Sequence, residues 1–184
     1  MAREVEVKLL MGQLRYDQVL SLLHAATLSE LSFMKRRAII DCYWPCDPNV
    51  SKAEFLRLRV SDDVELTTKV NDKGTIRDRI EHNCIIDGSD KDGALAVLHT
   101  ALGEPAKLLY RCTDFQVKDA DISVIENLEK PEWCFVEIES AMPEVIDYWR
   151  KRIEKQVDEN YSETIDVVKN SFYDIFVKRV GVLV

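Results

Sequence analysis

The sequence of 184 residues has few of the side chains that build the commonest zinc sites and hydrolase triads. Its three histidines are too dispersed for either kind of site. Its five cysteines lack the paired spacing of a zinc site, so we expect free thiols in a reducing compartment. These cysteines are Cys42, Cys46, Cys84, Cys112 and Cys134.

Long apolar runs and flexible linkers are also lacking. No stretch approaches the roughly 18 apolar residues that would span a bilayer, and the N-terminus carries charges in place of the apolar segment of a signal peptide. We therefore expect a soluble, cytoplasmic protein with no membrane partner. No linker rich in glycine, serine or proline interrupts the chain, and 46% hydrophobic residues are enough for a core, so we predict one domain over residues 1–184.

The charge balance argues against extended nucleic acid as a partner. The net charge is −8, which disfavours a broad electrostatic binding face for a polyanion. Arginine and lysine are nevertheless concentrated in a few short segments of alternating pattern. A basic site within an acidic protein favours a compact anion.

The N-terminal segment 3–10 alternates charged and apolar residues. As a strand, it would place Glu4, Glu6 and Lys8 on one face and the apolar residues on the other. An ordinary strand with one solvated face gives the same pattern. Similar alternation recurs at 57–59, 67–69, 77–81 and 137–139. This recurrence favours a sheet whose charged faces converge on one site.

Periodicity and turn residues predict an α+β fold with long antiparallel runs. Ser162 is expected to cap the last of four helices. The predicted strands are 3–10, 33–44, 54–61, 64–71, 75–87, 107–117, 121–128 and 133–140, and the other helices are 14–26, 89–102 and 143–157.

A series of motifs resembles the CYTH, or triphosphate tunnel metalloenzyme, superfamily over nearly the whole chain. That superfamily includes class IV adenylyl cyclases, thiamine triphosphatases and inorganic triphosphatases. The resemblance implies an antiparallel eight-stranded barrel, a tunnel with a charged interior and helices packed outside. In chain order, the motifs are Glu4-x-Glu6-x-Lys8, Asp41-Cys42-Tyr43-Trp44, Leu56-Arg57-Leu58-Arg59, Leu66-Thr67-Thr68-Lys69, Arg79-Ile80-Glu81, Phe135-Val136-Glu137-Ile138-Glu139 and Ser171-Phe172-Tyr173-Asp174-Ile175-Phe176.

The chemistry of these residue types suits a triphosphate bound with a divalent cation. Alternating carboxylates are ligands for Mg²⁺ or Mn²⁺, while guanidinium groups match phosphate oxygens in pairs and lysine acts as a point charge. A purely structural ion network is the alternative. The resemblance assigns metal binding to Glu4, Glu6, Glu126, Glu137 and Glu139, triphosphate binding to Lys8, Arg57, Arg59, Lys69, Arg77, Arg79, Arg111 and Lys169, and catalytic assistance to Lys8 and Glu81.

Two departures from the family pattern affect these assignments. Where relatives often have Lys-x-Arg, the chain has Leu109-Tyr110-Arg111, which leaves one cation missing or displaced to Lys107. The stretch 126–132 replaces the family's Asp-x-Val-x-x-Leu-Gly.

Metal-dependent hydrolysis of inorganic, nucleoside or thiamine triphosphate is the leading hypothesis. Conversion of ATP to cyclic AMP and non-catalytic binding of a nucleotide or polyphosphate are the alternatives, and the sequence leaves a homodimer open.

Overall fold

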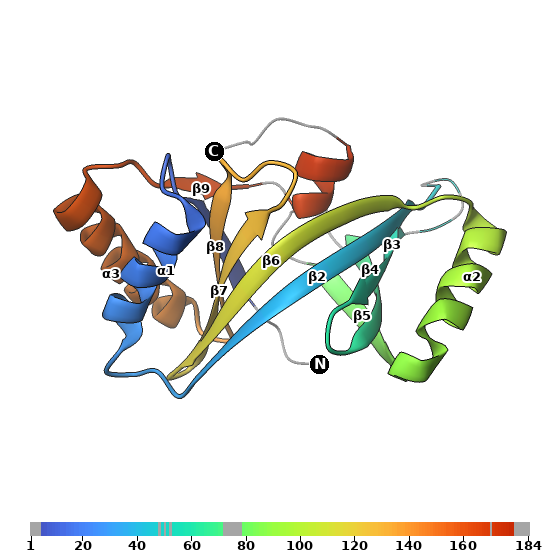
Figure 1. Cartoon of the computed structure of the whole chain (residues 1–184), viewed down its shortest axis with the longest axis horizontal. Coiled ribbons are helices and arrows are strands. Elements are labelled where there is room, and N and C mark those ends of the chain that lie inside the picture. Colours follow the sequence, from blue (N-terminus) through green and yellow to red (C-terminus); the bar gives the residue numbers. More distant parts are fainter. Residues whose placement is uncertain are drawn as a thin grey trace. The chain divides into compact units, whose positions relative to one another are not determined.

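The computed structural model describes residues 5–47, 49, 51, 53–71, 79–169 and 171–178, without the side chains of 71 and 79–81. Glu4 and Arg77 therefore lie outside the described residues, as do the side chains of Arg79 and Glu81. The chain is α+β, with an antiparallel sheet and a few helices (Figure 1). Within the described part of the chain, no helix is both long enough and apolar enough to cross a membrane.

The elements follow one another along the chain as strands interrupted by helices. They are β1 (Val5–Leu10), α1 (Tyr16–Thr27), β2 (Phe33–Pro45), β3 (Ala53–Val60), β4 (Val64–Asn71), β5 (Arg79–Ile86), the 3-10 helix η1 (Gly88–Asp90), α2 (Lys91–Leu102), β6 (Ala106–Val117), β7 (Ala120–Asn127), β8 (Cys134–Ser140), α3 (Pro143–Tyr161), β9 (Asp166–Val168) and the short π-helix η2 (Tyr173–Val177).

The chain divides into two compact units, which we describe separately. Unit 1 comprises residues 1–37, 110–169 and 182–184, and unit 2 comprises 38–109 and 170–181. Strands β2 and β6 each pass from one unit into the other. The prediction of a single domain over residues 1–184 stays a prediction.

Unit 1 is a sheet with helices α1 and α3 on its apolar face. Strands β6, β7, β8, β1 and β9 are neighbours in that order, and all pairings between β6 and β9 are antiparallel. Val7 of β1 lies opposite Ile138 of β8, which lies opposite Ile122 of β7. These positions pack in a core with Trp149 of α3, whose side chain is buried. The opposite face of the same strands carries the charged residues.

Unit 2 repeats this division with strands β5, β4, β3 and β2. Its apolar face buries Trp44 and Leu58, with Leu95 and Leu98 of α2 packed against them. Trp44 Nε1 donates a hydrogen bond of 2.8 Å to the carbonyl of Gly103, which follows α2. Helix α2 has no buried residue, whereas α1 and α3 of unit 1 each bury several.

The predicted α+β class with a large antiparallel sheet is confirmed, and the sheet of the described residues has nine strands in an open order. One detail of the predicted fold is wrong. The helix expected after Ser162 is absent there, because Ser162 ends α3 with a left-handed backbone (φ 53°) and the chain continues into β9. Val167 pairs with Leu9, so these β-branched residues extend the sheet in place of continuing a helix.

Candidate functional site

Three glutamates of unit 1 form a compact set, which we call the carboxylate group: Glu6, Glu137 and Glu139. In the β1–β8 pairing, Glu6 lies opposite Glu139 and Lys8 lies opposite Glu137. Directly opposed residues share a face, as do residues two apart on one strand, so all four side chains lie on the charged face. One carboxylate oxygen from each glutamate lies within 4.8 Å of the others.

Lys8 is buried at the centre of this arrangement, with 7% of the residue exposed. Its Nζ lies 2.6 Å from Oε1 of Glu6 and 2.6 Å from Oε1 of Glu137. Burial alone would lower the pKa of Lys8, but the charges and hydrogen bonds of Glu137 and Glu6 outweigh burial and raise it. Lys8 is therefore an ammonium ion throughout the neutral range.

The carboxylate group has the donor chemistry of a site for Mg²⁺ or Mn²⁺. Both ions prefer hard oxygen ligands, and Mg²⁺ commonly uses one or two carboxylates together with waters and phosphate oxygens. The Lys8 ammonium shows that a cation fits between two of these carboxylates. Among the residues that the structure describes, no other cluster of three or more acidic, histidine or cysteine side chains has this spacing.

Arg111 and Glu126 do not join the carboxylate group. They lie opposite each other in the β6–β7 pairing and form an ion pair. The guanidinium also lies 4.1 Å from the ring centre of Tyr16 on α1. Glu126 is two residues from Val124, which packs in the helix-covered core, so the pair belongs to the apolar face. Lys107 lies four residues before Arg111 on β6, so the alternation of the strand puts it on the same face as Arg111.

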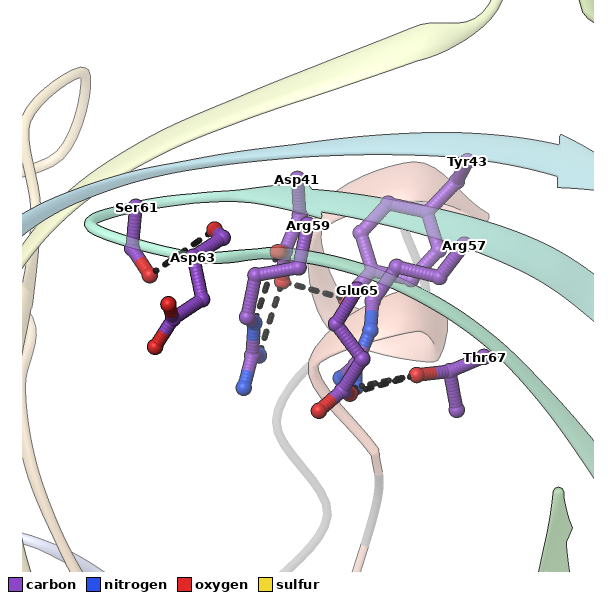
Figure 2. Close-up of polar contacts among 8 residues, drawn as sticks. All are labelled: Asp41, Tyr43, Arg57, Arg59, Ser61, Asp63, Glu65 and Thr67. Atoms are coloured by element: carbon purple, nitrogen blue, oxygen red, sulfur yellow. Dashed lines mark hydrogen bonds and ion pairs between the residues drawn. The ribbon is translucent and has the colours of Figure 1, made fainter. Parts of the chain in front are cut away.

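Two arginines of β3 are held on the charged face of unit 2 (Figure 2). Arg59 donates from Nε and Nη2 to the two carboxylate oxygens of Asp41, at 2.9 and 3.0 Å. Asp41 is 1% exposed and also accepts a hydrogen bond of 3.2 Å from the hydroxyl of Tyr43. Burial and the charge of Asp41 raise the pKa of Tyr43, which keeps this hydroxyl a donor. The guanidinium plane of Arg59 is thereby fixed.

Arg57 has a second, separate set of partners. Its Nη2 lies 3.2 Å from Oε1 of Glu65 and 3.1 Å from Oγ1 of Thr67, both on β4. The Thr67 hydroxyl donates to the same Glu65 oxygen at 2.6 Å. This triangle holds the buried guanidinium of Arg57 near that of Arg59, as Figure 2 shows.

For the other predicted cations, Lys69 and Lys169, the structure gives the strand position. Lys69 lies opposite Phe55 and Glu81 in the pairings of β4, so these positions share the face of Arg57. Lys169 directly follows β9 in unit 1, and its side chain is exposed. The catalytic and binding roles of these residues stay predictions.

A second polar cluster, which no motif of the sequence indicates, lies on the charged face of unit 1. Asp114 of β6 accepts hydrogen bonds from Ser123 at 2.8 Å and Cys112 at 3.1 Å, and its other oxygen lies 2.6 Å from Arg37. Ser123 lies opposite Glu137 across β7 and β8, which places this cluster beside the carboxylate group. The same alternation within β6 that places Arg111 on the apolar face indicates that Asp114 lies on the charged face.

Comparisons with family models and with curated proteins found no match. Solved structures are similar in fold. A Pyrococcus horikoshii protein has a TM-score of 0.67 at 20% identity, covering 96% of this chain and 99% of that one. HpAC1 of Hippeastrum, a putative adenylyl cyclase with a dominant triphosphatase activity, has a TM-score of 0.67 at 14% identity, covering 98% and 97%. A chain of the Schizosaccharomyces pombe Mediator head module has a TM-score of 0.56 at 8% identity, covering 89% and 96%. These likenesses show that this chain shares its fold with those solved structures.

Proposed function

We propose that this chain is an enzyme that hydrolyses a small triphosphate with the help of Mg²⁺ or Mn²⁺. The observation that carries the proposal is the carboxylate group, with its three ligand oxygens within 4.8 Å, on the charged face of the fold that HpAC1 shares. A fold alone does not establish an activity, so the residues must supply the argument.

In this proposal, the carboxylate group holds the metal ion. The ion would neutralise phosphate charge and lower the pKa of a bound water, as divalent metals do in phosphoryl transfer. For unit 2, taken by itself, we propose that Arg57 and Arg59 bind phosphate oxygens, and Asp41 keeps the Arg59 guanidinium in a fixed plane. Lys69 adds a further positive charge.

For some predicted residues, the structure describes no side-chain contacts, so their roles rest on the sequence motifs. Four predicted residues lie wholly outside the described residues or have undescribed side chains: Glu4, Arg77, Arg79 and Glu81. Arg111 and Glu126 are best explained as a pair that ties β6 to β7, because each uses the other as its partner.

Two other functions have specific support. The name of HpAC1 favours an adenylyl cyclase, in which the ribose 3′-hydroxyl attacks the α-phosphate of ATP and pyrophosphate leaves. The likeness to the Mediator head module favours a non-catalytic binder, since that chain is part of an assembly. Both alternatives can use the same cations for phosphate.

The deciding experiment incubates the purified chain with inorganic triphosphate, ATP or thiamine triphosphate, each with Mg²⁺ or Mn²⁺. Release of orthophosphate is expected. Cyclic AMP with pyrophosphate would instead identify a cyclase, and tight binding without turnover under either metal would identify a binder.

Glu139→Gln tests the metal assignment, because it removes one ligand charge with little change in volume. We expect turnover to be lost at limiting Mg²⁺, whereas Glu132→Gln, an exposed glutamate of the same unit, should be as active as the unaltered chain. Full activity of Glu139→Gln at limiting Mg²⁺ would exclude the proposed metal site.

A further inference from the structure

We propose that the Lys8 ammonium takes the place of a metal ion in the carboxylate group. Without metal, it holds the carboxylates together, and it competes with a divalent ion for them. The proposal rests on the metal assignment made under the proposed function. It concerns metal affinity, a property that can be measured without turnover.

The contacts of Lys8 are those of a bound cation. Its Nζ lies 2.6 Å from one oxygen of Glu6 and 2.6 Å from one oxygen of Glu137, two of the three residues with converging ligand oxygens. A metal ion that used the same oxygens would require the space of the ammonium, because Mg²⁺ lies about 2.1 Å from its ligands. Metal binding must therefore move Lys8 or use other oxygens beside a positive charge.

The charges explain why a stand-in cation is useful. Three clustered carboxylates repel one another, because like charges lie close together. The ammonium of Lys8 lies between two of them and offsets part of that repulsion.

Backbone pairing on both sides limits how far Lys8 can retreat. Strand β1 lies between β8 and β9, and the Lys8 backbone position pairs with Glu137 on one side and Val168 on the other. Only rotation of the side chain can take the ammonium away. An ammonium that stays within a few ångströms of a divalent ion opposes it by Coulomb repulsion, so Lys8 should weaken metal binding.

The test compares metal affinity in the unaltered chain, Lys8→Met and Lys8→Gln, with Lys118→Met as the matched control. Lys118 is an exposed lysine of unit 1 in the turn between β6 and β7. Mn²⁺ binding is measured by electron paramagnetic resonance and Mg²⁺ binding by calorimetry, both without substrate. We expect both Lys8 variants to bind metal about tenfold more tightly or better, since an opposing charge is removed. Lys118→Met should bind as the unaltered chain does.

Thermal unfolding adds a second readout. Without metal, the Lys8 variants should melt at a lower temperature than the unaltered chain, because the carboxylates lose their internal cation. Saturating Mg²⁺ should raise the melting temperature of the variants more than that of the unaltered chain.

A measurement on the unaltered chain keeps the proposal testable if the variants do not fold. The ¹⁵Nζ resonance of Lys8, assigned by its loss in Lys8→Arg, should shift when Mg²⁺ is added, as the ammonium leaves its partners. An unmoved resonance at saturating Mg²⁺, or equal or weaker metal affinity in the folded Lys8 variants, would overturn the competition while leaving the metal site intact. Absence of metal binding in every variant would overturn both the metal assignment and this inference.

Discussion

Asp41 is expected to be the residue on which the geometry of Arg59 depends. Asp41→Asn keeps the volume and one carbonyl oxygen but removes the charge and one of the two acceptors used by Arg59. Hydrogen bonds to charged groups contribute about 1.5 to 3 kcal/mol each, and Asp41 is 1% exposed, so water cannot replace what is lost. The Arg59 side chain is 27% exposed, which leaves part of its charge hydrated. We therefore expect a loss of about 2 to 3 kcal/mol in the free energy of unfolding.

Urea unfolding, followed by the intrinsic fluorescence of the three tryptophans, which include Trp44, measures this loss. Trp44 is the tryptophan of unit 2 and is buried on the opposite face of β2 from Asp41. Asp63→Asn is the matched control, because Asp63 is an exposed carboxylate in the turn between β3 and β4. A difference of less than about 0.5 kcal/mol between the two variants would refute the view that Asp41 anchors Arg59.

Three further predictions concern stability. Gly12→Ala should lower it by about 1 to 3 kcal/mol in urea unfolding, because Gly12 has φ +58° and an added Cβ would meet the carbonyl of Thr164 at 2.8 Å; an unchanged midpoint would contradict this. Trp149→Ala should cost about 3 to 5 kcal/mol, since the side chain is 1% exposed, and a cost below about 1 kcal/mol would show that the core is not packed around it. Burial raises the pKa of Asp174, but hydrogen bonds from Ser171 help to lower it below its ordinary value, so its stabilising effect is present above about pH 4 and disappears at lower pH. The difference in melting temperature between Asp174→Asn and the unaltered chain should therefore shrink on acidification; a difference independent of pH would contradict this.

The strands, and which residues lie on their charged and apolar faces, could be predicted because the alternation of charged and apolar residues is visible within each short segment. The strand predicted at 33–44 is β2, and that predicted at 133–140 is β8, with ends differing by one residue. Pro143 was expected to begin a helix, and it occupies the first turn of α3. In each case, a residue's neighbours two to four positions away determine the pattern.

The pairing order of the strands could not be predicted in this way. That order depends on which strand pairs with which, and alternation within a strand carries no information about its partner. The three residues of β9 are too short to give a strand pattern, and they form a strand because β1 offers an unpaired edge. The apolar residues after Ser162 also fit a helical period, but Asp166–Val168 form β9, and among the described residues the helix is confined to Tyr173–Val177.

The candidate site was predicted in part. Motif matching selected the carboxylate group and the arginines Arg57 and Arg59, which the structure brings together within their own units. It also selected Arg111 and Glu126, although the register of β6 and β7 places both on the helix-covered face. A residue's type suggests its chemistry, whereas its place in the alternation decides which face of the sheet its side chain occupies.

The position of β1 between β8 and β9 has a consequence for how the chain folds during synthesis. Strand β1 leaves the ribosome before both of its neighbours, which end at Ser140 and Val168, so it must wait for their synthesis before it can pair. During that interval, its charged residues lower its tendency to associate with other nascent chains. A prematurely truncated polypeptide that lacks β8 would therefore lack both the partners of β1 and two of the three glutamates.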